Sequence, residues 1–140
     1  MQCGVKNMDL IMQMKGSQKI GCMIKKTGLK DREQTNCIEV VRTNTKPDLD
    51  LSKHDLNKQE LEKGNLGIGH HFIIKLDGTI EKARDINKVG SGRKDAISLC
   101  IVGGLNKDNI EDKTFTKNQR ISYGKIIDFI YKTYGVNKVV

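Results

Sequence analysis

The 140-residue sequence contains no tryptophan, and its aromatic side chains are limited to three phenylalanines and three tyrosines. Few side chains are therefore available to stack on nucleic-acid bases or on sugar rings. No apolar run approaches the roughly 20 residues that a membrane-spanning helix requires, and the N-terminus lacks the uninterrupted apolar core of a secretory signal peptide. These absences argue against a membrane protein and against export by the general secretory route.

Cysteines are also few, and the four of them show neither Cys-x-x-Cys spacing nor a disulfide framework. Cys37 and Cys100 fall within predicted strands, where we expect them to pack as small apolar groups. This pattern favours reduced thiols and an intracellular protein. A chain of this length suits a single domain, which buries about two-thirds of the surface that the unfolded chain exposes.

The charge is strongly basic, with 25 lysines and arginines against 17 acidic residues and a net charge of +8. Such a balance suits nucleic acid, an anionic cell wall or an acidic partner protein, and it does not choose among them. The lysines are scattered along the chain, and no recognised nucleic-acid module is visible. Nucleic acid is therefore not the favoured partner.

The run from Gly67 to Asp85 contains a predicted β-hairpin. Phe72 to Lys75 is rich in residues typical of strands, and Asp77-Gly78 supplies the positive-φ pair that a tight hairpin turn needs. The return strand is predicted over residues 79–83. An earlier core strand is predicted over residues 37–43.

Two helices are predicted from their caps. Ser52 can cap a helix that runs to about Lys63, with Gly64 as its stop. The final helix begins with the capping box formed by Thr116 and Gln119 and ends at Gly135. Its apolar residues recur at three- and four-residue spacing, so we expect them to pack on the sheet; they are Ile126, Ile127, Ile130, Tyr131 and Tyr134.

The hairpin sequence, with Gly-His-His-Phe-Ile-Ile followed by Asp-Gly-Thr, resembles the zinc-dependent N-acetylmuramoyl-L-alanine amidases of the phage-lysozyme and peptidoglycan-recognition-protein type. Members of that family carry Gly-Tyr-His-Phe-Ile-Ile and Asp-Gly-Thr. The resemblance covers roughly residues 30–140 and implies an α/β fold with a mixed central β-sheet flanked by helices. It also implies hydrolysis of the amide between the glycan's lactyl group and the first stem-peptide alanine. Further segments follow in the family's order: Lys30 to Glu33, Ile38 and Val40, Thr45 to Pro47, Val89 to Ser91, Ser98 to Gly104, and Phe115-Thr116.

The resemblance implies a catalytic zinc held by three protein ligands, with a fourth position open for water. The family's first ligand, a histidine, corresponds to Val41, which has no donor atom. The second histidine, the third ligand and an assisting lysine follow the last helix in the family, beyond Val140. These departures predict a degenerate member with no zinc, no other cofactor and no catalytic residue.

The three histidines of the sequence are not expected to provide a replacement metal site. His70 and His71 are adjacent on a predicted strand, where successive side chains point to opposite faces, and His54 reads as a solvated residue near a helix start. We expect His71 to be a core-facing or hydrogen-bonded structural histidine. His70 replaces a tyrosine that often faces the family's substrate, and both a ligand contact and simple exposure remain open for it.

Four residues are candidates for lining the former active-site cleft that the resemblance implies: Val41, Arg42, His70 and Lys94. The loop Gly92 to Asp95 is shorter than the rim of the phage enzymes that the chain resembles. Arg42 replaces a cysteine that often follows the first ligand. If Arg42 points into the cleft, its charge disfavours a metal and favours an anion; orientation towards solvent is the alternative.

Residues 1–29 lie outside the resemblance and form a predicted N-terminal extension to an amidase-like domain of residues 30–140. This extension holds all five methionines, which are adaptable at contact surfaces. We expect it to dock on a partner, and an added strand that covers the domain's own core is the alternative. The docking candidates are Met8, Leu10, Ile11, Met12 and Met14.

Three functional hypotheses follow. The favoured one is a non-catalytic amidase-fold protein, a phage-encoded pseudoenzyme that acts as a binding, structural or regulatory component in the host cytoplasm or the virion. Its partner would be a phage or host protein or a peptidoglycan fragment. The first alternative is an active peptidoglycan amidase with a rebuilt or partner-completed metal site. The second is capture of a small anionic ligand by Arg42, His70 and Lys94.

Overall fold

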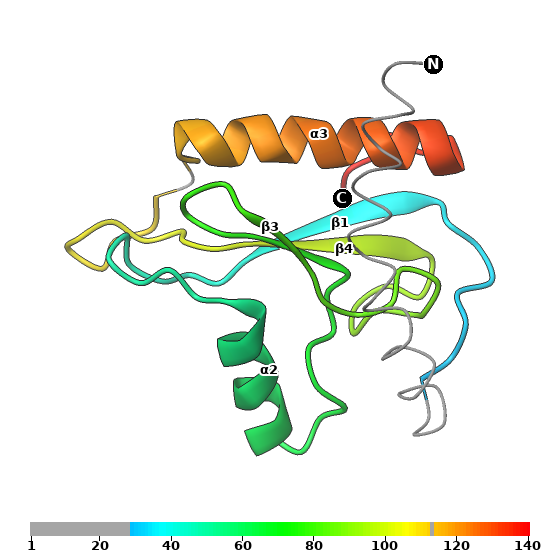
Figure 1. The fold of residues 1–140 in the computed structure, drawn as a ribbon, viewed down its shortest axis with the longest axis horizontal. Helices are drawn as coiled ribbons and strands as arrows, with labels where there is room; N and C mark the ends of the chain where they lie inside the picture. The colour runs from blue at the N-terminus through cyan, green and yellow to red at the C-terminus, as the bar shows by residue number, and fades with distance from the viewer. Residues whose placement is uncertain (1–28, 113) are drawn as a thin grey trace.

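The computed structural model describes residues 29–112 and 114–140, in which four strands form one sheet with a helix on each side (Figure 1). The strands are β1 (Cys37–Arg42), β2 (Phe72–Ile74), β3 (Ile80–Lys82) and β4 (Ala96–Ile101). The helices are α2 (Lys53–Glu62) and α3 (Lys117–Tyr134).

The sheet has the strand order β1-β4-β2-β3 and is mixed. β4 is parallel to both of its neighbours, whereas β2 and β3 are antiparallel. All six residues of β4 are buried, as expected for a central strand covered on both faces. The predicted fold class, a mixed sheet flanked by helices, is confirmed.

The predicted hairpin is present, with short strands. Gly78 has a φ of 89°, and the amide of Lys75 donates to the carbonyl of Thr79 at 2.9 Å across the turn. β3 is shorter than predicted, although the amide of Ala83 still donates to the carbonyl of His71 at 3.0 Å. The turn chemistry therefore set the register of the hairpin.

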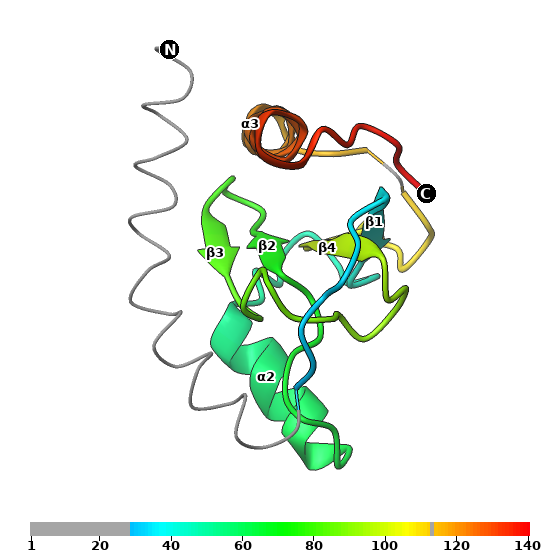
Figure 2. The same ribbon diagram turned by 90° about the vertical axis from the view of Figure 1, so that its right-hand side faces the viewer.

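Helix α3 covers one face of the sheet, and α2 lies on the opposite side (Figure 2). The main core lies beneath α3, where the rings of Phe72 and Phe129 meet edge to face with centroids 6.3 Å apart. The Thr116–Gln119 capping box and the left-handed Gly135 bound the helix, as predicted. The predicted stripe was wrong at Tyr131, which is 53% exposed.

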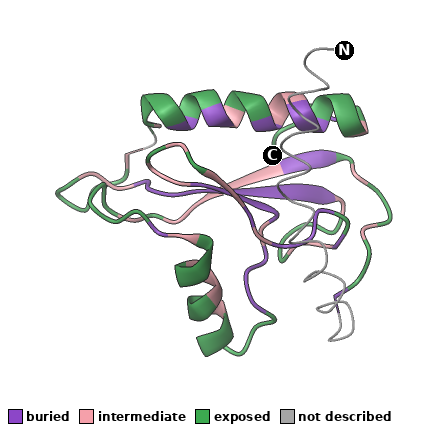
Figure 3. Ribbon diagram, viewed as in Figure 1, coloured by how far each residue is buried: buried purple, intermediate pink, exposed green. Residues whose placement is uncertain are grey.

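The second core cluster lies on the α2 side of the sheet and contains Leu51, Ile68, Ile73, Cys100 and Val102. Helix α2 begins at the predicted cap, Ser52, and contributes no buried residue. Figure 3 shows this contrast, with buried residues concentrated in the sheet and exposed ones along most of α2. The sheet and its adjoining loops, rather than α2, therefore provide the buried residues on this side.

Cys37 and Cys100 are both buried with free thiols, as predicted. Burial raises the pKa of the Cys100 thiol to about 12, so it behaves as a small apolar side chain. No helix in the described ranges is both long and apolar enough to cross a membrane. The partner-docking candidates, with Met8 and Met14 at the two ends of the set, lie outside the described residues. The boundary at residue 29 between the N-terminal extension and the amidase-like domain stays a prediction.

Candidate functional site

The sheet face turned away from α3 carries the polar side chains of the candidate site, and we call it the cleft face. Side chains alternate along a strand, so the residues between those that pack under α3 lie on the cleft face. In the parallel register of β1 and β4, Glu39 pairs with Ser98 and Val41 pairs with Cys100. Glu39 and Val41 are each partly exposed, whereas Ser98 is buried. A carboxylate and a hydroxyl therefore lie side by side on this face.

His70 joins this pair from the segment before β2. Its Nδ1 lies 2.8 Å from Ser98 Oγ, and its carbonyl accepts a hydrogen bond from the amide of Arg84 at 2.8 Å. The ring is partly exposed. Burial lowers the pKa of His70 below its ordinary value, and the negative charges of Glu39 and Glu60 partly oppose that shift.

His71 is fully buried and both of its ring nitrogens are in use. The backbone N–H of Ser98 donates to Nδ1 at 2.9 Å, and Nε2 lies 2.7 Å from the carbonyl of Lys88, to which it must donate. This arrangement fixes the neutral ring in one tautomer. Desolvation lowers the pKa of His71 to about 4. The prediction of a hydrogen-bonded structural histidine is confirmed.

The structure separates Val41 from Arg42. Val41 packs against the second core cluster on the cleft face, whereas Arg42 lies on the α3 side, with its guanidinium carbon 4.8 Å from the centroid of the Phe115 ring. The Arg42 guanidinium also donates to the carbonyl of Thr114 at 3.3 Å. Desolvation lowers the pKa of Arg42, and the nearby Asp112 opposes the shift. Arg42 therefore does not share a surface with His70.

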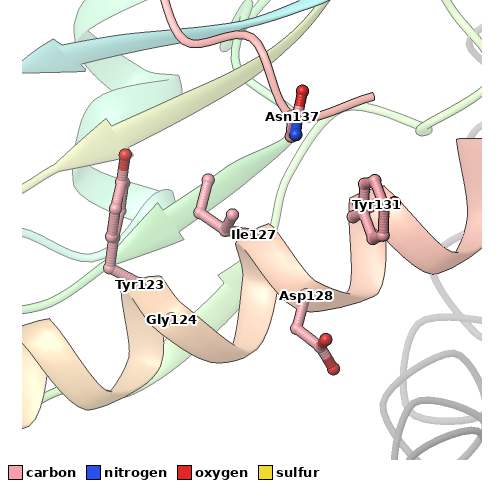
Figure 4. A pocket seen from close by; sticks show the side chains of 6 residues that line it. All are labelled: Tyr123, Gly124, Ile127, Asp128, Tyr131 and Asn137. Carbon is pink, nitrogen blue, oxygen red and sulfur yellow. The ribbon is translucent and has the colours of Figure 1, made fainter. Parts of the chain in front are cut away.

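Lys94 lies on the exposed loop before β4 and lines a separate cavity of about 680 Å³ with Lys30, Glu33 and Val89 among its walls. A smaller cavity of about 350 Å³ lies on α3, where Tyr123, Ile127 and Tyr131 are ranged along the helix beneath Asn137 (Figure 4). Of the four predicted cleft residues, only Val41 and His70 lie on the cleft face. Arg42, His70 and Lys94 therefore do not form one anion site.

Sequence reasoning missed Glu39 and Ser98. Each is the third residue, and the polar one, of an apolar stretch of five strand residues, Cys-Ile-Glu-Val-Val and Ala-Ile-Ser-Leu-Cys. This matching position was the sequence signal that could have indicated their pairing, because two such strands in parallel register bring their third residues together.

The resemblance to amidases implies a zinc ion, so we tested whether the described residues fit one. Val41 offers no donor, and both ring nitrogens of His71 are occupied by backbone groups. Within residues 29–112 and 114–140, no three histidine, cysteine, aspartate or glutamate side chains are grouped so that they could hold a metal ion. These residues do not fit a resident zinc.

The fold is the one shared by solved amidases and peptidoglycan-recognition proteins. A solved endolysin amidase, LysCS from Clostridium intestinale, superimposes with a TM-score of 0.68 over 79% of this chain and 70% of its own, at 24% identity. No protein-family model matches the sequence.

Two curated relatives are more informative than the solved structure. The endolysin of Escherichia phage T7 is 36% identical over 109 residues, which is 75% of this chain and 72% of the relative. The endolysin of Enterobacteria phage T3 is 34% identical over 113 residues, or 78% of this chain and 75% of the relative. The chain belongs to the family of T7-type phage endolysins.

This membership overturns the favoured functional hypothesis. The hypothesis of a non-catalytic pseudoenzyme was wrong, because the chain shares about a third of its residues with phage endolysins over about three-quarters of its length. That prediction gave too much weight to Val41 and to the family's ligand positions that correspond to residues beyond Val140. The similarity supports the first alternative, an active peptidoglycan amidase encoded by a phage.

Proposed function

We propose that the protein is a phage endolysin that hydrolyses peptidoglycan as an N-acetylmuramoyl-L-alanine amidase. The bond cleaved would be the amide between the lactyl group of the glycan and the first alanine of the stem peptide. The observation that carries this proposal is the 36% identity with the phage T7 endolysin over 109 residues. Two partly exposed polar side chains on the expected fold, Glu39 and His70, are compatible with it.

The charge of the chain also suits this substrate. A net charge of +8 attracts the carboxylates of stem peptides and concentrates the protein at an anionic wall. The attraction between exposed charges is screened over about 8 Å at physiological ionic strength. We therefore expect binding to whole cell walls to weaken as salt is added, before cleavage of a small, soluble muropeptide is affected.

Zinc supplies the activated water in the amidases that this chain resembles. The described residues do not fit that ion, so their contribution is assigned to substrate binding and to proton transfer. Within the cleft face, the groups available for these roles are Glu39, His70 and Ser98.

Product analysis tests the proposal. Purified full-length protein would be incubated with peptidoglycan sacculi and with a defined disaccharide pentapeptide, and the products separated and identified by mass spectrometry. We expect a free stem peptide with a new N-terminal alanine and a disaccharide that keeps its lactyl carboxylate. New reducing ends without free peptide would instead indicate a glycosidase. Binding without any cleavage, with and without added zinc, would refute the proposal.

A chelation experiment then distinguishes metal-dependent activity from metal-independent activity. Activity that is lost in chelator and restored by zinc would mean that residues other than the described ones hold the ion. Activity that is unchanged would mean that the cleft residues act without a metal. Heat-unfolded protein and the exposed-residue variant His54→Ala provide matched controls for the first assay.

A further inference from the structure

Lys82, the last residue of β3, buries an amine that nothing in the described part of the chain pairs with. The residue is 6% exposed, and its Nζ has no hydrogen-bond partner within residues 29–112 and 114–140. Lys88 provides the contrast, since it is also buried but donates to the carboxylate of Asp31. A buried ammonium without an acceptor is costly, so the unpaired Nζ of Lys82 indicates a missing anion.

Lys82 lies at the edge of the sheet, beside the main core. β3 is the last strand in the order β1-β4-β2-β3, with no strand on its outer side among the described residues (Figure 2). Lys82 pairs with Phe72 across the hairpin, and paired residues share one face of a sheet. Phe72 belongs to the core under α3, against which Ile80 of β3 also packs. The unpaired amine therefore stands at an apolar border that is open to a further segment.

The charges near Lys82 do not supply the missing anion. Burial lowers the pKa of Lys82, Asp85 raises it and Lys53 lowers it. The Nζ of Lys53 donates to the carbonyl of Lys82 at 3.3 Å, so a second ammonium lies close to the strand. Asp85 accepts a hydrogen bond from the amide of Asn87 at 2.9 Å and none from Lys82. A further carboxylate would suit this border of β3.

The N-terminal extension offers one such carboxylate. Asp9 is the only acidic residue in positions 1–28. It stands within an apolar run, whose members match a border that joins one buried amine to apolar core residues; they are Met8, Leu10, Ile11 and Met12. The sequence thus complements the border of β3 in both charge and polarity.

The chain can reach this border from the point where the extension joins the domain. Asp31 forms an isolated bridge with Lys88, and the amide of Arg32 donates to the carbonyl of Asn87 at 2.7 Å. The domain therefore begins beside the segment that follows β3. Residues 9 and 29 are twenty positions apart, which span about 30 Å if helical and up to about 66 Å if extended. Either length suffices to return along β3.

We propose that residues 1–28 dock on the outer side of β3 in the same chain, where Asp9 accepts a hydrogen bond from Nζ of Lys82. The apolar residues on either side of Asp9 then cover Ile80 and the border of the main core. This inference selects the second of the two hypotheses for the extension, in which it covers the domain's own core. It does not depend on the proposed amidase function.

Zero-length cross-linking of full-length protein tests the contact directly. A water-soluble carbodiimide activates a carboxylate, and an amine in contact with it then forms an amide, with the net loss of one water. We expect mass spectrometry to find Asp9 joined to Lys82, and to find no such product in Asp9→Asn. Lys58→Met, at an exposed lysine, should keep the cross-link. In a mixture of nitrogen-14 and nitrogen-15 protein, each cross-link should contain a single isotope.

Trypsin gives a second readout, because Lys15 and Lys19 lie in the extension. We expect Asp9→Asn and Lys82→Met each to speed cleavage after these lysines by about 10-fold or more, as for loss of a hydrogen bond between charged groups. The double variant should be cleaved no faster than either single variant, and Lys58→Met should match the wild type. Asp9→Asn lies outside the described domain, so it tests the pairing even if Lys82→Met weakens the fold.

Three results would overturn the inference. They are a cross-link from Asp9 to a different lysine, a cross-link that joins the two isotopes, and cleavage of Asp9→Asn within twofold of the wild-type rate. The second result would place the extension on another copy of the chain, and the third would leave it free to bind a partner. Neither readout uses peptidoglycan, so failure here leaves the proposed function untouched.

Discussion

Acidification should destabilise the protein through His71, and the structure gives both the sign and the size of the effect. The ring is fully buried, it receives the amide proton of Ser98 on Nδ1, and it donates from Nε2 to the carbonyl of Lys88. A second ring proton would have no acceptor at Nδ1 and would place a charge in the core. The folded protein therefore favours the neutral ring, and the positive charges of Arg32 and Arg84 act in the same direction.

The magnitude follows from the difference between the two states. The pKa of His71 falls from an ordinary value of 6.5 to about 4 in the folded protein. Because each pKa unit corresponds to about 1.4 kcal/mol, the neutral ring contributes about 3 kcal/mol to the free energy of unfolding. The unfolded chain binds the proton first, so this contribution is complete above pH 6.5 and is lost as the pH falls towards 4. A domain with a typical stability of about 5 to 15 kcal/mol would register that loss clearly.

Urea unfolding followed by circular dichroism at several pH values between 7.5 and 4, roughly the titration window of the ring, measures this contribution. The variant His71→Gln should be about 1 to 3 kcal/mol less stable at neutral pH, because a buried hydrogen-bonding ring is lost. Its stability should also fall less steeply between pH 6.5 and 4. His70 is present in both proteins, so the difference in slope isolates His71. Asp95, whose pKa is lowered to about 2 by hydrogen bonds from Arg93 and Asn36, titrates below this window.

The control is His54→Gln, which alters an exposed histidine and should keep the wild-type slope. If His71→Gln shows the same pH dependence as the wild type, the assignment of a buried, neutral His71 is refuted. An equal loss of slope in both variants would point to a general charge effect instead, since either change removes one titrating group from the unfolded chain.

Four further substitutions test the packing by urea unfolding. Phe129→Ala should cost about 3 to 5 kcal/mol, because Phe129 is 2% exposed and packs edge to face on the core; Tyr131→Ala, at a 53% exposed residue, should change stability by less than about 0.5 kcal/mol. Gln119→Leu should cost about 1 to 3 kcal/mol, since its amide donates to the buried carbonyl of Val102 at 2.8 Å. Gly78→Ala should cost more than about 1 kcal/mol, because φ is 89° and a Cβ would lie 2.7 to 3.0 Å from the start of α3. Equal losses for Phe129→Ala and Tyr131→Ala, or losses below about 0.5 kcal/mol for either of the other two, would contradict the observed packing.

Local chemistry made the ends of α3 predictable from sequence. The Thr116–Gln119 capping box and the glycine at residue 135 act within one helical turn, so no tertiary information is needed to place them. The buried face of the helix was less predictable. Tyr131 lies about 100° around the helix from Ile130, and only the position of the sheet decides that Phe129 is buried and Tyr131 exposed.

The candidate site was predictable only in part, for a similar reason. Strand alternation places Arg42 on the face opposite Val41, so the sequence itself argues against both residues lining one cleft. The pairing of Glu39 with Ser98 depends on the register between two strands about 60 residues apart. Hydrophobic patterning fixes that register only when the whole sheet assembles, so the matching polar positions in the two strands indicated the pairing without establishing it.

Ser98 forms hydrogen bonds to both of the adjacent histidines. Its backbone N–H and carbonyl bond to Nδ1 and the N–H of His71, each at 2.9 Å, and its hydroxyl meets His70 at 2.8 Å. The buried His71 therefore bonds to the backbone of the same residue whose hydroxyl contacts the partly exposed His70. Protonation of His71 would remove the acceptor for the Ser98 amide, so acid should weaken this part of the core. Two adjacent histidines thus have different surroundings, because one strand residue bonds to one ring through its backbone and to the other through its side chain.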